Sequence, residues 1–268
     1  MPELKPYELY AIRYAHNANA KRSNAFIGGD PHDGPMPLDC FVWAIKGPDG
    51  TFILDTGFDE PMGEKRGRQF LRSPSVGLQA IGVDHSQVQD VILSHMHYDH
   101  CGNYDLFPAA RYHLQDKEMA YCTGRCMCHA TMRYPFDAED VVAMVRRLHE
   151  GHVCFHDGTD ELAPGLTVHH IGGHTMGLQV VRAWTRRGWV VLASDASHLY
   201  ANMNEGRPFP VVYNVADMLE GHKTLFRLAS SDNHVIPGHD PLVLKRYPAA
   251  RPETEGWIVR VDAEPKRA

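Results

Sequence analysis

The chain lacks the long apolar run that a membrane-spanning helix requires, because no stretch of about 18 consecutive apolar residues occurs in it. Its first residues, MPELKP, do not have the basic and then apolar character of a secretory signal. Cysteine is also scarce, and 6 cysteines in 268 residues do not make a disulfide framework. These absences predict a cytoplasmic protein without a membrane partner.

Positive charge is outnumbered by negative charge, with 27 Lys and Arg residues against 33 Asp and Glu residues. The formal net charge of −6 and the absence of a dense basic stripe argue against a nucleic-acid partner. The 43% hydrophobic and 22% charged residues are typical of a globular protein with an ample core. We expect one domain over residues 1–268, with residues 253–268 as a surface tail, and assembly as a homodimer stays open.

Histidine, in contrast, is abundant, with 18 residues. Four potential metal ligands lie in the run HMHYDH at residues 95–100, directly after an apolar segment. Side chains two apart in an extended segment point to the same side, so His95, His97 and Asp99 can converge, and a turn can bring His100 to them. Imidazole and carboxylate together suit zinc and its first-row neighbours. A packed cluster of structural histidines is the alternative.

Three further candidate ligands follow apolar segments later in the chain. His174 lies in GGHTMG, Asp195 in SDA and His239 in PGHD. A single histidine or aspartate at the end of a strand is more often structural. The shared placement of all three favours a common metal site.

The periodicity of apolar residues predicts a chain of alternating strands and helices. Strands are expected over residues 8–14, 40–45, 51–54, 90–93, 110–114, 166–171, 178–185, 189–193 and 234–237. Helices are expected over residues 75–81, 116–121, 137–150 and 215–229. Two strand-rich halves that each carry helices predict an α+β fold, in which two sheets pack face to face with the helices outside.

The motifs H-x-H-x-D-H, G-G-H-T-x-G, S-D-A and P-G-H-D, in this order, resemble those of the metallo-β-lactamase superfamily. Asp55-Thr56-Gly57 also matches the family's D-T-G after an early strand. The resemblance extends from about Leu9 to Leu244. It implies an αββα sandwich with a metal site at the edge between the two sheets.

The resemblance further implies a dinuclear centre built from imidazoles and carboxylates. It assigns His95, His97 and His174 to the first metal, Asp99, His100 and His239 to the second, and Asp195 to both. It also implies that Asp55 lies behind the ligands and orients a histidine. The expected cofactor is two Zn²⁺, although manganese, cobalt and iron suit the same ligands.

Such a centre predicts hydrolysis. A metal ion lowers the pKa of its bound water from about 15.7 to about 7, so that hydroxide can attack at neutral pH. Esters, lactones, thioesters and amides are the substrates that this chemistry can open. Within the resemblance, Asp99 is the candidate to carry a proton during catalysis.

The sequence around the ligand run is similar to that of the N-acyl homoserine lactonase branch. This similarity implies opening of a lactone ring, either N-acyl homoserine lactone, as in quorum quenching, or a related lactone. One position departs from the branch, which commonly has a tyrosine three residues after the bridging aspartate. His198 occupies that position here, and Tyr200 follows two residues later. We expect His198 to donate to the substrate carbonyl in place of the tyrosine, with Tyr200 as the alternative.

Several alternatives stay open at this point. A thioesterase resembling glyoxalase II, a small-ester hydrolase, a mononuclear iron persulfide dioxygenase and a non-catalytic metal-binding scaffold would share several of these ligands. Cys122, Cys126 and Cys128 are either part of an additional metal site or free thiols. Apolar residues of the loop from Arg22 to Leu38, among them Phe26 and Met36, either line an acyl pocket or pack beneath the loop.

Overall fold

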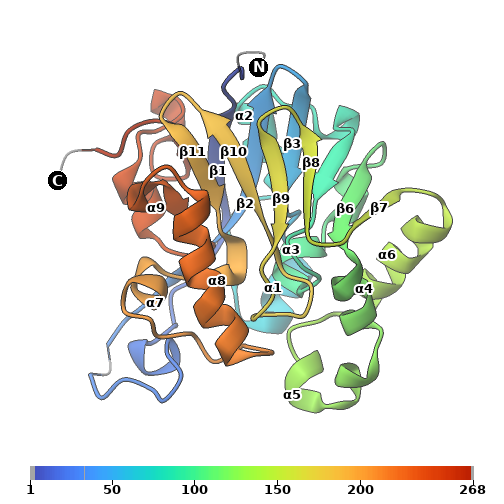
Figure 1. Cartoon of the computed structure of the whole chain (residues 1–268), viewed down its shortest axis with the longest axis vertical. Helices are drawn as coiled ribbons and strands as arrows, with labels where there is room; N and C mark the ends of the chain where they lie inside the picture. Colours follow the sequence, from blue (N-terminus) through green and yellow to red (C-terminus); the bar gives the residue numbers. More distant parts are fainter. Residues whose placement is uncertain (1–3, 33, 267–268) are drawn as a thin grey trace.

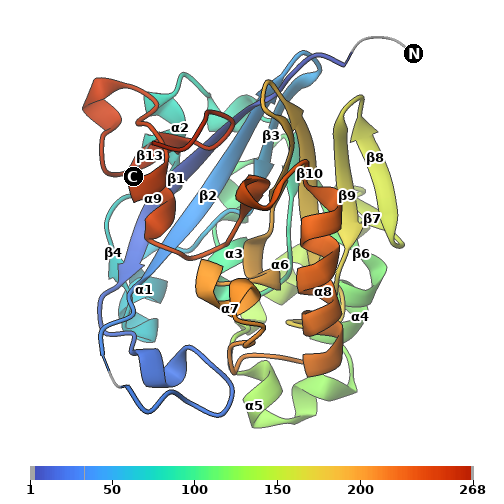
Figure 2. The same cartoon turned by 60° about the vertical axis from the view of Figure 1, so that its left-hand side comes forward.

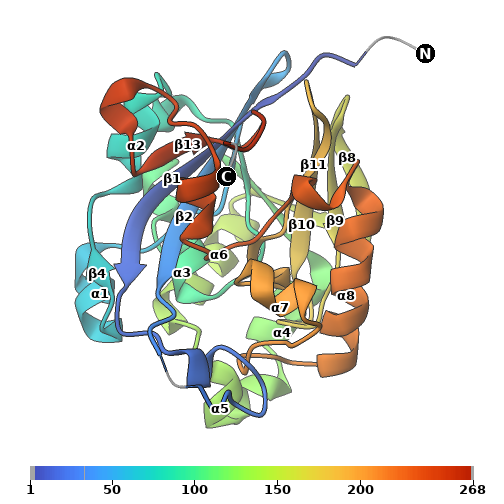
Figure 3. The same cartoon turned by 90° about the vertical axis from the view of Figure 1, so that its left-hand side faces the viewer.

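Two β-sheets pack face to face, with helices on their outer sides (Figures 1 and 3). The computed structural model describes residues 4–266 except residue 33. The αββα sandwich expected from the sequence is therefore confirmed.

The first sheet has the strand order β13-β1-β2-β3-β5-β6-β7, and β4 pairs with β1 at its side. The bounds of its strands are β1 Glu8–Asn17, β2 Leu38–Gly47, β3 Gly50–Leu54, β4 Gln69–Phe70, β5 Asp90–Ile92, β6 Arg111–Gln115, β7 Val153–His156 and β13 Ile258–Arg260. The second sheet has the order β12-β11-β10-β9-β8. Its strands are β8 Thr159–Ala163, β9 Leu166–His170, β10 Gln179–Thr185, β11 Gly188–Leu192 and β12 Val235–Ile236.

The helices connect and cover these sheets (Figure 2). Their bounds are α1 Glu60–Arg66, α2 Pro74–Ala80, α3 Tyr98–Cys101, α4 Asp116–Cys122, α5 Ala130–Arg133, α6 Ala138–His149, α7 Tyr200–Asn204, α8 Val215–Leu228 and α9 Leu242–Arg246. Capping explains where the longest ones begin. Asp137 accepts a hydrogen bond from the backbone of Glu139 at the start of α6, and Asn214 accepts from Ala216 at the start of α8.

The central strands β1, β2, β3 and β5 of the first sheet contribute residues to cores on both faces, which explains their nearly continuous apolar sequences. In β1, Leu9 and Ala11 belong to the core between the two sheets. The alternate residues Tyr10 and Ile12 belong to a second core, beneath the outer helices. Strand periodicity thus divides one segment between two hydrophobic layers.

The strand directions explain why distant motifs meet. β3 and β5 are parallel, and so are β11 and β12. β9 is antiparallel to β10, which is antiparallel to β11, so β9 runs in the same direction as β11. A motif that the sequence singled out follows each of the strands β3, β5, β9, β11 and β12. Their carboxyl ends therefore deliver all five motifs to one end of the sandwich.

The C-terminal segment differs from the expected surface tail. Ile258–Arg260 form β13, which pairs antiparallel with β1, and Ile258 and Val259 are buried. Val261 also belongs to the core between the sheets. A strand of only three residues has too little periodicity to be recognised from sequence. No helix of residues 4–32 and 34–266 is both long and apolar enough to cross a membrane.

Candidate metal centre

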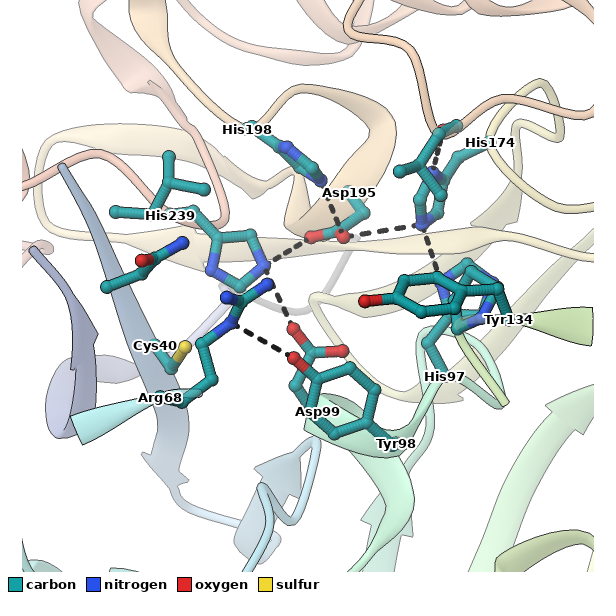
Figure 4. Close-up of a pocket in the computed structure, with 14 residues that line it drawn as sticks. Cys40, Arg68, His97, Tyr98, Asp99, Tyr134, His174, Asp195, His198 and His239 are labelled. Carbon is teal, nitrogen blue, oxygen red and sulfur yellow. Dashed lines mark hydrogen bonds and ion pairs between the residues drawn. The ribbon is translucent and has the colours of Figure 1, made fainter. Parts of the chain in front are cut away.

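All seven predicted ligands lie together at the end of the sandwich, in loops and short helices that follow the strands. Together with Cys40 and His198 they form four groups, in each of which the candidate ligand atoms lie within 4.8 Å of one another. These groups are His95, His97 and His174; His95, His100 and Asp195; Cys40, Asp99 and His239; and His174, Asp195 and His198. Figure 4 shows the members that line the central cavity.

Asp195 lies at the middle of the cluster. Its Oδ2 is 3.3 Å from His174 Nε2, 3.5 Å from His100 Nε2 and 3.9 Å from His95 Nε2. Its Oδ1 is 3.0 Å from His239 Nε2. One carboxylate thus faces imidazoles from both halves of the chain, which is the position that a bridging ligand requires.

Three imidazoles face one another at short range. His174 Nε2 is 3.2 Å from His95 Nε2 and 2.9 Å from His97 Nδ1. Burial lowers the pKa of all three, that of His174 to about 4, and neighbouring histidines lower those of His95 and His97 further. These histidines are therefore neutral, which is the form that coordinates metal ions.

Two buried polar atoms show that the residues fit a metal ion. Among the described residues, His100 Nε2 and Asp195 Oδ1 have no hydrogen-bond partner, although both are inaccessible to solvent. His239 Nε2 is near Asp195 Oδ1 but lacks the alignment of a hydrogen bond. Unpartnered polar groups are costly in an interior, and a metal ion would satisfy both atoms.

A layer of hydrogen bonds fixes the orientation of the imidazoles from behind. Asp55 Oδ2 lies 2.8 Å from His100 Nδ1, which confirms the expected role of Asp55. The backbone carbonyls of Val211 and Asp39 face the Nδ1 atoms of His174 and His239, at 2.7 and 2.8 Å. Each bond leaves Nε2 pointing into the cluster, as is usual for histidines that bind metals.

Backbone strain accompanies this arrangement. Asp55 has φ of 63° and Ser194 has φ of 43°, and neither is a glycine. Asp55 accepts hydrogen bonds from Ser94 N at 2.7 Å and from Ser94 Oγ at 2.9 Å, and Ser194 Oγ bonds to Ser94 Oγ at 2.8 Å. Strained positions of this kind persist where surrounding bonds over-determine them, and they are typical of functional sites.

His198, and not Tyr200, faces the cavity. His198 Nε2 is 2.9 Å from Asp195 Oδ2, and its ring stacks on Phe209 with centroids 3.4 Å apart. Tyr200 instead belongs to the core between the sheets, where Arg246 covers its ring. The position of the two side chains therefore favours His198 over Tyr200 for the predicted role.

The central cavity, of about 90 Å³, is flanked by two larger ones of about 400 Å³ each. We call the first the loop chamber; its polar lining residues are Asn17, Asn19, Lys21, Asn24, Arg68 and His198. We call the second the helix chamber; its main lining residues are Tyr121, Met132, Tyr134, Pro135, Pro210 and Val211. The metal cluster thus lies between a space of mixed polarity and a largely apolar space.

Residues of the loop from Arg22 to Leu38 were expected either to line a pocket or to pack beneath the loop, and the structure has one of each. Met36 lines the loop chamber, whereas Phe26 is buried and packs beneath the loop under the guanidinium of Arg207. Cys122, Cys126 and Cys128 are free thiols, and none belongs to the metal-ligand groups found among the described residues.

Cys40 and Glu118, which the sequence did not single out, lie in or beside the cluster. Cys40, in β2, joins Asp99 and His239 in the cluster. Glu118, in the helix expected over residues 116–121, was assigned no role, but its buried carboxyl accepts hydrogen bonds from Met96 N at 2.9 Å and from Gly177 N at 3.0 Å. A Cβ on Gly177 would lie 2.1 Å from the backbone of Glu118, so the close approach requires glycine. The signal in the sequence that could have identified Glu118 is an acidic residue on the face of α4 that is otherwise buried.

Comparison with known proteins agrees with this geometry. The model of the metallo-beta-lactamase superfamily matches residues 35–239. The N-acyl homoserine lactonase AiiB of Agrobacterium fabrum is 27% identical over 190 residues, which cover 65% of this chain and 67% of AiiB.

Solved structures show the same fold at lower identity. A quorum-quenching N-acyl homoserine lactone lactonase is 20% identical, with a TM-score of 0.71, over 90% of this chain and 94% of its own. AidC, a dizinc quorum-quenching lactonase, is 17% identical, with a TM-score of 0.65, over 89% of each chain.

Proposed function

The chain belongs to the metallo-beta-lactamase superfamily, and from this premise we propose that it is a dinuclear-metal hydrolase that opens lactone rings. The observation that carries the proposal is the cluster of imidazoles around Asp195, with its unpartnered buried Nε2 and Oδ1 atoms. We assign the activity to residues 1–268 acting as one domain.

The proposed ligand assignment is the one that the family resemblance implies, and the short distances within the cluster support it. His95, His97 and His174 would hold one metal ion, Asp99, His100 and His239 the other, and Asp195 would contact both. When bound, two such ions lower the pKa of water and polarise a carbonyl group. Zinc is the proposed ion, and manganese, cobalt and iron suit the same donors.

The residues of the chain supply positioning and proton transfer. Ring opening adds one water molecule: the carbonyl carbon gains an oxygen, the ring C–O bond breaks, and the leaving oxygen takes a proton. The Asp99 carboxylate lines the cavity, 3.8 Å from His100 Nε2 and 3.9 Å from His239 Nε2, where it can accept and return that proton. His198 lines the same cavity, with Nε2 2.9 Å from Asp195 Oδ2, and can donate to the substrate carbonyl.

A lactone is the substrate class that the relatives support. AiiB is named as an N-acyl homoserine lactonase and is the relative with the highest identity given above. The replacement of the branch's tyrosine by His198 favours a lactone related to homoserine lactone, or a small ester, as the substrate.

Metal analysis combined with an activity panel tests the proposal. About two zinc ions per purified chain are expected, together with acid release from acyl homoserine lactones or simple lactones. Release from thioesters alone would support a thioesterase resembling glyoxalase II and reject the lactonase. One iron per chain would support a persulfide dioxygenase and reject hydrolysis.

Replacement of Asp195 tests the ligand assignment. Asp195→Asn removes the charge that faces five imidazoles, so we expect loss of metal together with lactonase activity. Asp116→Asn, at an exposed position on α4, is the control and should retain both. Full activity in Asp195→Asn would show that the bridging assignment is wrong.

A further inference from the structure

Arg68 is an unusual residue in the wall of the metal cavity. It follows α1, where its backbone N–H donates to Gly63 O at 2.8 Å, and its side chain lines both the central cavity and the loop chamber. Figure 4 shows Arg68 in the wall of this cavity, where it bonds to Tyr98, the residue before Asp99. A permanent positive charge is thus placed next to the proposed reaction centre.

Most of the hydrogen-bonding capacity of Arg68 is unused. Its Nε donates to Tyr98 Oη at 3.2 Å. Neither terminal nitrogen makes a hydrogen bond or an ion pair within 4.0 Å with any residue of 4–32 or 34–266. Two terminal nitrogens in one plane present parallel N–H groups, which match the two oxygens of a carboxylate.

The two chambers differ in charge. Arg68 lines the loop chamber, and no Asp or Glu is among its described lining residues. The helix chamber has no Lys, Arg, Asp or Glu among its described lining residues. The carboxylates of Asp99 and Asp195 line only the central cavity, where the metal ions would neutralise them. An anion therefore finds favourable surroundings on one side of the centre only.

We propose that Arg68 binds a carboxylate of the substrate, so that the enzyme prefers lactones or small esters that carry an acidic group close to the scissile carbonyl. This inference rests on the proposed function and narrows its substrate class. Because Arg68 lines the same small cavity as the cluster, the carboxylate and the carbonyl must be only a few bonds apart. The helix chamber is then free to hold an apolar substituent.

A matched pair of substrates tests the inference. The γ-butyrolactone that carries a carboxylate on its γ-carbon is compared with the corresponding carboxamide, which has nearly the same shape without the charge. The wild-type enzyme should hydrolyse the carboxylate with at least a tenfold higher kcat/KM. In Arg68→Gln, kcat/KM for the carboxylate should fall roughly 10- to 100-fold, because a charged hydrogen bond contributes that much. The value for the carboxamide should change less than about threefold.

Controls separate recognition from folding. Arg68→Gln should keep the wild-type metal content and melting temperature, and Arg111→Gln, at an exposed position, should keep the wild-type preference. Equal loss on both substrates, loss of metal, or no wild-type preference would overturn the inference.

A binding measurement keeps the inference distinct from the proposed function. If neither lactone of this pair nor any lactone of the panel above is hydrolysed, the lactonase proposal fails, and calorimetry with hydroxyglutarate, the ring-opened product, tests Arg68 alone. Binding that weakens at least tenfold in Arg68→Gln would still support a carboxylate site. Absent or unchanged binding would reject it.

Discussion

His198 is the residue at which the centre departs most from the family pattern. Its Nε2 contacts Asp195 Oδ2, and it is also grouped with His174 and Asp195 among the potential ligands. It can therefore act either on the substrate or on a metal ion, and substitution can distinguish these roles.

We predict that His198→Phe retains both metal ions but lowers kcat about 10²- to 10³-fold, as expected on loss of a donor to a developing oxyanion. The phenyl ring preserves the stacking on Phe209. His198→Tyr should recover part of the activity, since its hydroxyl can donate. Elemental analysis and steady-state kinetics provide the measurements; loss of one metal ion in His198→Phe would identify a ligand instead of a donor.

The buried carboxyl of a second residue, Asp140, should make the free energy of unfolding depend on pH. It lies in the first turn of α6, and its Oδ2 has no partner among the described residues. Burial, followed by Asp137 and Asp59, raises its pKa to about 7, against the opposing effects of Lys65 and Arg66 from α1. A carboxyl with a raised pKa in the folded state stabilises the fold less as pH rises from about 4 to 7.

Asp140→Asn should therefore be more stable than the wild type by roughly 1–3 kcal/mol at pH 8, and by less at pH 5. The N-terminus of α6 stabilises the ionised carboxylate. The expected gain in the free energy of unfolding is therefore smaller than the full pKa shift would give. Denaturant unfolding at both pH values measures it. Glu139→Gln, one residue earlier and exposed, should show no such pH dependence. An equal gain at both pH values would contradict the explanation by titration.

At the scale of elements, a buried carboxylate joins loops from the two halves of the chain. Glu118 lies on α4, and its carboxylate accepts hydrogen bonds from backbone N–H groups of the loop after β5 and of the loop between β9 and β10. These loops carry His95, His97 and His174. Their relative position, and with it the geometry of the first metal site, depends on this connection.

We predict that Glu118→Gln releases metal to a chelator faster than the wild type. An amide has only one acceptor oxygen, so one of the two N–H groups loses its partner, at a cost of about 1–3 kcal/mol. Metal release in the presence of EDTA and denaturant unfolding measure the two consequences. Glu64→Gln, exposed on α1, is the matched control. Unchanged release from a folded Glu118→Gln would show that the carboxylate does not position the loops.

The success of sequence prediction also depended on the element. Long strands such as β1 and β10, and helices with clear caps such as α6 and α8, were predicted close to their observed bounds. The short elements α1, α7 and β13 were missed, because tertiary contacts and not periodicity stabilise segments of a few residues. Cys40 and Arg68 were missed for a related reason: each reaches the centre from an element without a recognisable motif.

At the scale of the whole molecule, the order of motifs was sufficient to predict the sandwich and the grouping of the ligands. Parallel strands within each sheet bring their carboxyl ends to one edge, so motifs that follow those strands must meet there. The two flanking chambers could not be predicted in this way. They form where the early loop, α5 and residues 209–212 come together, and such loop contacts have no periodic signature.

Because the centre joins both sheets, metal ions should stabilise the entire fold. A ligand present at about 1,000 times its Kd stabilises the folded state by about 4 kcal/mol, which corresponds to roughly 8–15 °C in the melting temperature of a protein of this size. Removal also leaves His100 Nε2 and Asp195 Oδ1 buried without partners. We therefore predict that EDTA lowers the melting temperature by this amount and that added zinc restores it, as measured by calorimetry. The melting temperature of Asp195→Asn should change little with EDTA or with zinc. An unchanged melting temperature of the wild type after verified loss of metal would show that the ions do not stabilise the folded state.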